Sequence, residues 1–314
     1  MRQWISAAGG LVLGWLAAAP LFACSSAEPP VPAREPSSSR DVSSPDISGL
    51  GFVGEGDLLA VHDAKGGNDR ARVSRVYLPD TEAVPRTDTV PVEAGDRRWP
   101  GTDLESIAPI PGTSLVLMAE SGGGREVGEP APQIFLAEYR RGRLFILDAT
   151  DWPVPVENVE GTAVASAAGN LVFLYAERAD GRHSTRLRWA TLSLQPLAFG
   201  PFRESEFAPR TSKVANLRPV SAIDIDAEGV VYAASAVDPG NGGPFRSIVW
   251  RIGRLRADDY GQPLLALEAR PRRLAVVDGL KVEGLAVRRI AGKTEIVIGT
   301  DDESYGGVIR PLPR

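Results

Sequence analysis

Short segments of alternating apolar and polar residues recur along most of the chain. In five of them an apolar residue directly precedes a Ser or Glu, and the alternation continues two residues after that Ser or Glu, at Leu50, Ile107, Thr162, Ile223 or Leu285. The five segments are DISGLGF from 46, DLESIAP from 103, NVEGTAV from 158, RPVSAID from 218 and KVEGLAV from 281. The Ser or Glu is Ser48, Glu105, Glu160, Ser221 or Glu283, about 55 to 62 residues apart. A period of two predicts a β-strand in each segment, and the spacing indicates an internal repeat.

Two further predicted strands follow each of these segments. The second strands lead to Asp63, Glu120, Glu177, Ser235 and Asp301. The third strands carry Tyr77, Phe135, Trp189 and Trp250, with Ile309 in the fifth unit. A weaker fourth strand, such as 143–148, follows in most units. This recurrence predicts an all-β fold, a β-propeller whose blades pack face to face. A β-sandwich with accidental similarity between its strands is the alternative.

The five repeats predict five blades over residues 46–314, with six blades as the alternative count. The fifth unit reaches the last residue after three strands. The Ser- and Pro-rich segment before residue 46 is unsuited to form the missing fourth strand of this blade. We therefore expect a propeller with a thin or partly open seam.

The first 45 residues differ from the rest in composition. Residues 1–23 have an early Arg, an apolar stretch and small residues near the end, the layout of a secretory signal peptide. A retained membrane helix is the alternative, but Gly and Pro interrupt the stretch and no basic segment follows it. Residues 24–45 consist mainly of Ser, Pro and charged residues, which predicts a disordered tether.

The only cysteine, Cys24, directly follows Leu21-Phe22-Ala23. This ending resembles the lipobox of bacterial lipoproteins, in which the cysteine becomes the acylated mature N-terminus. The resemblance implies a membrane partner held through a lipid on Cys24, and Ser25 after it implies outer-membrane retention. An ordinary signal peptide with an incidental cysteine is the alternative.

Charge and composition exclude several functions. A net charge of −5 gives no broad basic surface, so we expect no nucleic-acid partner. One Cys excludes a disulfide framework, and together with two His it argues against zinc. We expect a monomer with an unidentified small-molecule or protein ligand.

Each of the five repeats has two equivalent positions, the Ser or Glu of its first strand and the residue to which its second strand leads. Seven of these ten positions are acidic. Antiparallel pairing brings these positions to one edge of each sheet, so they should gather at one mouth of the channel. The candidate metal ligands are Asp63, Glu105, Glu120, Glu160, Glu177, Glu283, Asp301 and Asp302. Crowded carboxylates must share protons, pair with Arg or bind a cation, and Ca²⁺ is the cation we expect. Pairing with Arg125, Arg178 or Arg182 and scattered solvated acids remain alternatives.

The segments DLESIAP, NVEGTAV and KVEGLAV, each followed by a strand leading to Glu or Asp, resemble the repeats of phytase-like propellers described as having esterase-like activity. The resemblance covers about residues 46–312. It implies a secreted propeller with a cation-binding face and metal-dependent phosphoester hydrolysis, with Glu105, Glu160, Glu283 and Asp301 as metal or structural positions. Ser48 and Ser221 depart from this motif, and no Asp-Asp-Pro sequence is present.

Two functions follow. The first is a surface-anchored propeller whose acidic mouth binds a cation and a ligand or partner. The second is a metal-dependent phosphoesterase or esterase that uses the same mouth. No catalytic nucleophile or base is identified by the sequence, which favours the first.

Overall fold

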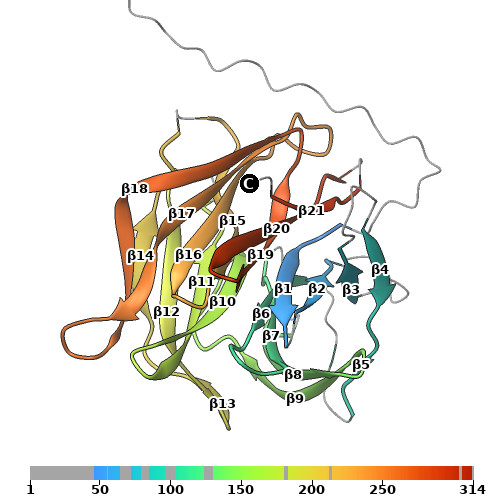
Figure 1. Cartoon of the computed structure of the whole chain (residues 1–314), viewed down its shortest axis with the longest axis vertical. Coiled ribbons are helices and arrows are strands. Elements are labelled where there is room, and N and C mark those ends of the chain that lie inside the picture. The colour runs from blue at the N-terminus through green and yellow to red at the C-terminus, as the bar shows by residue number, and fades with distance from the viewer. Residues whose placement is uncertain are drawn as a thin grey trace, which may run out of the picture. The chain divides into compact units, whose positions relative to one another are not determined.

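The strands form five antiparallel sheets around a common centre, so the predicted all-β, five-bladed propeller is confirmed (Figure 1). The computed structural model describes residues 46–312 except 55, 64–71, 79–84, 96–98, 100–102, 124–129, 180–182, 212–213 and 304–305. The predicted signal peptide, Cys24 and the tether lie outside the described residues. Within these residues the structure contains no helix that could span a membrane.

The first three blades follow one another along the chain. Blade 1 comprises β1 (Gly49–Val53), β2 (Asp57–Val61), β3 (Val73–Tyr77) and β4 (Arg86–Thr89). Blade 2 comprises β6 (Leu104–Pro109), β7 (Leu115–Glu120), β8 (Gln133–Arg140) and β9 (Arg143–Asp151), and β5 (Val92–Glu93) joins it in parallel beside β9. Blade 3 comprises β10 (Val159–Ala167), β11 (Asn170–Glu177), β12 (Thr185–Leu194), β13 (Leu197–Phe199) and β14 (Arg203–Phe207).

The last two blades differ in their outer strands. Blade 4 comprises β15 (Leu217–Ile225), β16 (Val230–Val237), β17 (Arg246–Ala257) and the long β18 (Pro263–Asp278). Blade 5 has three strands, β19 (Val282–Ile290), β20 (Lys293–Thr300) and β21 (Ile309–Pro311). Within the part of the chain that the structure describes, blade 5 therefore has one strand fewer than blade 4, as expected from the sequence.

The alternating strands bury both of their faces because each blade packs against two others. Five hydrophobic clusters lie between adjacent blades, one at each interface. The aromatic residues of the third strands, Phe135, Trp189 and Trp250, are buried in these clusters. Tyr77 differs, because its half-buried ring lies under the guanidinium groups of Arg75 and Arg86.

Blade 5 meets blade 1 mainly through side-chain packing. Ile47 N–H donates to Thr300 O over 3.1 Å, and Ile47 and Leu50 fill the interface. Gly299 has to be glycine here, because a Cβ would lie 2.5 Å from Ile47 Cγ2. The inner strands β1, β6, β10, β15 and β19 contact one another in turn, and this brings their first residues to one mouth.

Candidate functional site

Three of the repeated glutamates lie at β-bulges that open the inner strands. Leu104 pairs with Glu120 and Ser106 with Ala119, so Glu105 is the extra residue between two pairs. The same register shift encloses Glu160 in β10 and Glu283 in β19. A bulge changes the direction of its extra side chain. All three glutamates consequently line the central channel.

The channel itself is almost filled. Its cavity measures about 10 Å³, and Thr162 donates a hydrogen bond to Ser106 across it over 2.9 Å. This volume holds about one water molecule at most. The channel therefore has no room for a larger ligand, and the carboxylates gather at its mouth, which we define by nine acids. The acidic mouth consists of Asp46, Asp63, Asp103, Glu105, Glu160, Asp238, Glu283, Asp301 and Glu303.

Arg218 is a central cation of the acidic mouth. Its guanidinium group donates to Glu283 Oε1 over 2.5 Å and lies 3.5 Å from Glu160 Oε2, and it also contacts Asp238. Glu160 receives a second hydrogen bond from Arg178. Burial acts to lower the pKa of Arg218, but Glu160, Glu283 and Asp238 outweigh it and raise the pKa. The predicted alternative of arginine pairing therefore applies to Glu160 and Glu283.

Lys281 is the second central cation, and its side chain is only 1% exposed. Its Nζ lies 2.9 Å from Asp301 Oδ2, 2.5 Å from Glu303 Oε1 and 3.4 Å from Glu283 Oε1. Burial acts to lower the Lys281 pKa, but Glu283 and Asp301 raise it above its usual range. Burial also acts to raise the Asp301 pKa, yet the Lys281 ammonium lowers it overall.

The acids around Lys281 and Arg218 outnumber the cations, and two of them respond by holding protons more tightly. Burial raises the pKa of Glu283 to about 8, although Lys281 and Arg218 oppose the shift. Burial, together with Asp301 and Glu303, raises the pKa of Asp46 to about 7. Shared protons and paired cations thus both reduce the repulsion.

Three predicted ligands serve their own blades instead. Glu120 accepts a hydrogen bond from Gln133 N over 3.0 Å. Glu177 pairs with Arg188 over 3.2 Å and with Arg186 over 3.5 Å. The fully buried Asp302 accepts hydrogen bonds from Lys281 N and Thr300 Oγ1, each over 2.7 Å. The structure therefore does not bring these three carboxylates to the mouth.

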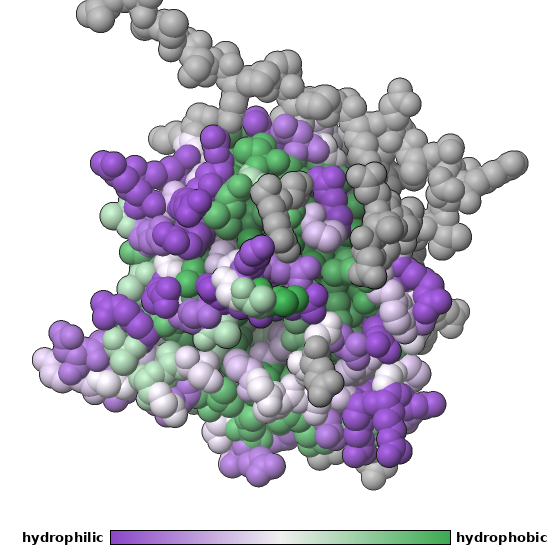
Figure 2. All heavy atoms as spheres, in the orientation of Figure 1, coloured by the Kyte–Doolittle hydropathy of each residue, from purple (hydrophilic) through white to green (hydrophobic). Residues whose placement is uncertain are grey.

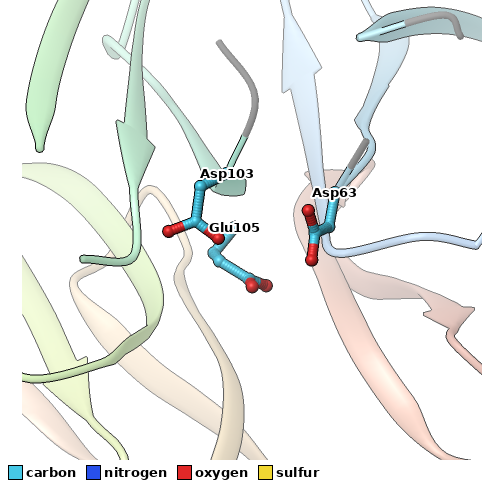
Figure 3. A group of neighbouring side chains, drawn as sticks. All are labelled: Asp63, Asp103 and Glu105. Atoms are coloured by element: carbon cyan, nitrogen blue, oxygen red, sulfur yellow. The ribbon is translucent and has the colours of Figure 1, made fainter. Parts of the chain in front are cut away.

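The remaining predicted ligands, Asp63 and Glu105, lie together with Asp103, and we call this group the carboxylate triad. One carboxylate oxygen from each lies within 4.8 Å of the others, and all three residues are half-buried. Asp63 follows β2 in blade 1, whereas Asp103 and Glu105 flank the start of β6 in blade 2. Figure 3 shows Asp63 facing Asp103 and Glu105 across the space between the blades.

Neighbouring groups hold the triad in position. Ser121 Oγ donates to Asp103 Oδ2 over 2.6 Å, and Gly122 N donates to the same oxygen over 3.2 Å. Asp63 N donates to Ser48 Oγ over 3.0 Å, and an isolated β-bridge joins Asp63 to Asp103. The Asp103 carboxylate is thus anchored by two hydrogen bonds. Together with Asp63 and Glu105 it forms an oxygen-rich group of the type that binds a hard divalent cation.

Six residues at the mouth were not predicted as site residues: Asp46, Asp103, Arg218, Lys281, Asp238 and Glu303. A signal was present for the first four. Asp46, Asp103 and Lys281 each stand two residues before their repeat position, and Arg218 stands three before Ser221. These upstream positions add two acids, Asp46 and Asp103, and two cations, Arg218 and Lys281, to the same rim. Of the predicted arginine partners, Arg178 is paired, whereas Arg125 and Arg182 lie outside the described residues.

No protein-family model matches the chain, and no curated protein matches it in sequence. Its fold is similar to that of an endo-1,4-β-xylanase from Bacteroides thetaiotaomicron, with TM-score 0.51, 10% identity and 86% of this chain and 90% of that chain covered. An exo-1,5-α-L-arabinanase from a bovine ruminal metagenomic library gives TM-score 0.47 and 13% identity, covering 87% and 95% of the two chains. A GH43 endo-arabinanase from Bacillus licheniformis gives 0.45 and 11%, covering 87% and 95%. Identity this low shows the fold alone. The phytase-like resemblance therefore stays a prediction.

Proposed function

We propose that this chain is an exported propeller, anchored to the outer membrane through Cys24, that binds Ca²⁺ at the carboxylate triad and presents it to a ligand. The observation that carries the proposal is the convergence of Asp63, Asp103 and Glu105 within 4.8 Å. Of the eight acids predicted as metal ligands, Asp63 and Glu105 are the two that the triad includes.

Electrostatics supports a cation at this group. Carboxylates at such separations repel one another when they carry charge, and half-burial weakens the screening by water. A divalent cation relieves that repulsion. Ca²⁺ takes six to eight oxygen ligands, so three carboxylates leave coordination positions for water or for an anionic or hydroxyl-bearing ligand.

Calcium titration of the thermal unfolding midpoint tests the proposal. We expect Ca²⁺ to raise the Tm of the chain, by linkage to the folded state. The double variant Asp103→Asn/Glu105→Gln should lose that shift. Asp259→Asn, which changes an exposed carboxylate on the turn between β17 and β18, should keep it. An equal Ca²⁺ response in the wild type and the double variant would refute the assignment.

A second candidate function is phosphoester or ester hydrolysis at the same mouth, as in the phytase-like family that the sequence resembles. It is favoured by one electrostatic interaction: Glu105 of the triad is among the carboxylates that raise the pKa of Arg218. A bound metal ion would supply Lewis acidity there. Release of p-nitrophenol from its phosphate or acetate ester, abolished by chelation and in Glu105→Gln, would establish this activity.

The anchor has a test of its own. Cys24→Ala should move the chain from the membrane fraction to the soluble fraction, because acyl chains contribute about 0.8 kcal/mol per buried CH₂. A Ser25→Ala variant keeps the cysteine and should remain with the membrane. Continued sedimentation of Cys24→Ala with membranes would show that the lipid is not the anchor.

A further inference from the structure

A groove of about 450 Å³ opens between blades 4 and 5, away from the acidic mouth. It is lined by the beginning of β16 and the later part of β17, whereas the mouth lies at the opposite ends of these strands. Blade 4 has four strands and blade 5 has three. Among the described residues, the outer part of the blade 4 face therefore has no strand of blade 5 opposite it, and the groove lies there.

Four arginines line this groove: Arg251, Arg254, Arg272 and Arg289. The carboxylate in the lining, Glu295, is paired with Arg288 over 2.5 Å. We call the four lining arginines, Arg251, Arg254, Arg272 and Arg289, and the space between them the arginine groove.

The arginines of the groove are only partly neutralised. Arg251 pairs with Glu268 over 2.8 Å, and Arg289 pairs with Glu228 over 2.9 Å. Arg254 and Arg272 are exposed, and neither has an ion pair among the described residues. Each guanidinium group carries five N–H donors, so the paired arginines also retain donors for another anion.

Part of the groove wall is apolar. Leu274 of β18 and Ile296 of β20 line it, and both pack against the hydrophobic cluster between blades 4 and 5. Figure 2 shows hydrophobic surface among hydrophilic side chains in the region where Figure 1 places β18 and the C-terminus. A ligand that fits this surface has both a charged end and an apolar part.

We propose that the arginine groove binds a small organic anion, in which a carboxylate, sulfonate or phosphate is joined to an aromatic or alkyl group. Arginine forks bind such anions through two parallel hydrogen bonds, and these are stronger than bonds between neutral groups. The volume lies within the range of small-molecule sites. The site shares no residue with the carboxylate triad, and so it does not depend on the proposed function.

Titration with 8-anilinonaphthalene-1-sulfonate, a fluorescent aromatic sulfonate, tests this site in the folded full-length chain. We expect saturable binding that weakens as salt is added, because the attraction is electrostatic. The double variant Arg251→Gln/Arg272→Gln should bind the probe at least about tenfold more weakly, as loss of charge-assisted hydrogen bonds predicts. Wild-type affinity in this variant would overturn the proposal.

Two controls separate a specific site from general apolar adhesion. Arg86→Gln/Arg143→Gln removes two exposed arginines of β4 and β9 and should leave the affinity unchanged. The uncharged analogue N-phenyl-1-naphthylamine should bind the wild type more weakly than the sulfonate. Equal binding of both probes would show that the arginines contribute nothing, and this also overturns the proposal. An unchanged Tm in each variant confirms that the fold is intact.

Discussion

The acidic mouth and the arginine groove are both rich in charge, but they differ in how the charges are compensated. At the mouth, the fully buried Lys281 and the largely buried Arg218 lie among carboxylates and contact several of them. In the groove, exposed Arg254 and Arg272 have no ion pair among the described residues. Counting charges would rank the mouth first as a binding site. Contacts and burial show that many of the charges at the mouth form ion pairs within the protein.

The difference follows from where each region lies in the fold. The mouth lies where the inner strands of all five blades meet. A charge buried there loses its hydration and needs a protein group of opposite charge. The groove lies beside blade 5, which has three strands among the described residues. Arg254 and Arg272 of the groove remain exposed to solvent. Charge at the mouth therefore contributes mainly to stability and positioning, except at the carboxylate triad, whereas charge in the groove is available to a ligand.

Removal of the central lysine should give the largest effect. Lys281→Met deletes the cation that contacts Asp301, Glu303 and Glu283, and it leaves buried carboxylates without that partner. We expect a loss of about 3–5 kcal/mol in the free energy of unfolding, measured by urea denaturation. Lys293→Met, an exposed change at the start of β20, should have little effect. Equal stability of the two variants would contradict the difference between the two regions.

The pH dependence of stability should give the next largest effect. Burial raises the Glu283 pKa from 4.5 to about 8, so between these values the folded protein holds a proton that the unfolded chain has released. The free energy of unfolding should fall as pH rises through this window, by up to about 1.4 kcal/mol per pH unit from this group. The raised pKa of Asp46 acts in the same direction up to about pH 7. Asp301, with a lowered pKa, acts below this window.

Glu283→Gln should make that dependence shallower, because glutamine binds no proton. Urea denaturation of both proteins at pH 5, 6, 7 and 8 measures the slope. Glu204→Gln, an exposed change in β14, should retain the wild-type slope. Identical slopes in the wild type and Glu283→Gln would show that this carboxyl does not hold the extra proton.

The smallest effect should come from the groove. Arg272→Met removes an exposed cation with no ion pair among the described residues, so the free energy of unfolding should stay within about 0.5 kcal/mol of the wild type. Affinity for the sulfonate probe should nevertheless decrease. A large loss of stability would place the groove in the same class as the mouth.

The fold was predictable from the sequence because each blade repeats the same strand pattern. The starts of β6, β10 and β19 match the segments containing Glu105, Glu160 and Glu283. The short fifth blade was also expected, because the fifth repeat has three predicted strands. The fate of Tyr77 was not predictable: the paired arginines beside its ring belong to cross-strand contacts that the repeat pattern does not encode.

The site was predictable only in part, because the bulges alter which side chains face each other. Simple alternation pairs Glu160 with Glu177, but the extra residue makes Val159 the partner of Glu177. Glu177 then contacts Arg186 and Arg188 of its own blade. No residue pattern in these segments indicates a bulge, so the distribution of acids between the mouth and the blade interior could not be derived from the sequence.

Calorimetric titration of Ca²⁺ into the folded chain tests the central claim most directly, since it measures binding rather than stability. We predict one Ca²⁺ per chain in the wild type, the same stoichiometry in Asp259→Asn, and loss of binding in Asp63→Asn and in Asp103→Asn/Glu105→Gln. No binding heat in the wild type, or unchanged binding in the triad variants, would contradict the assignment of the carboxylate triad as a calcium site.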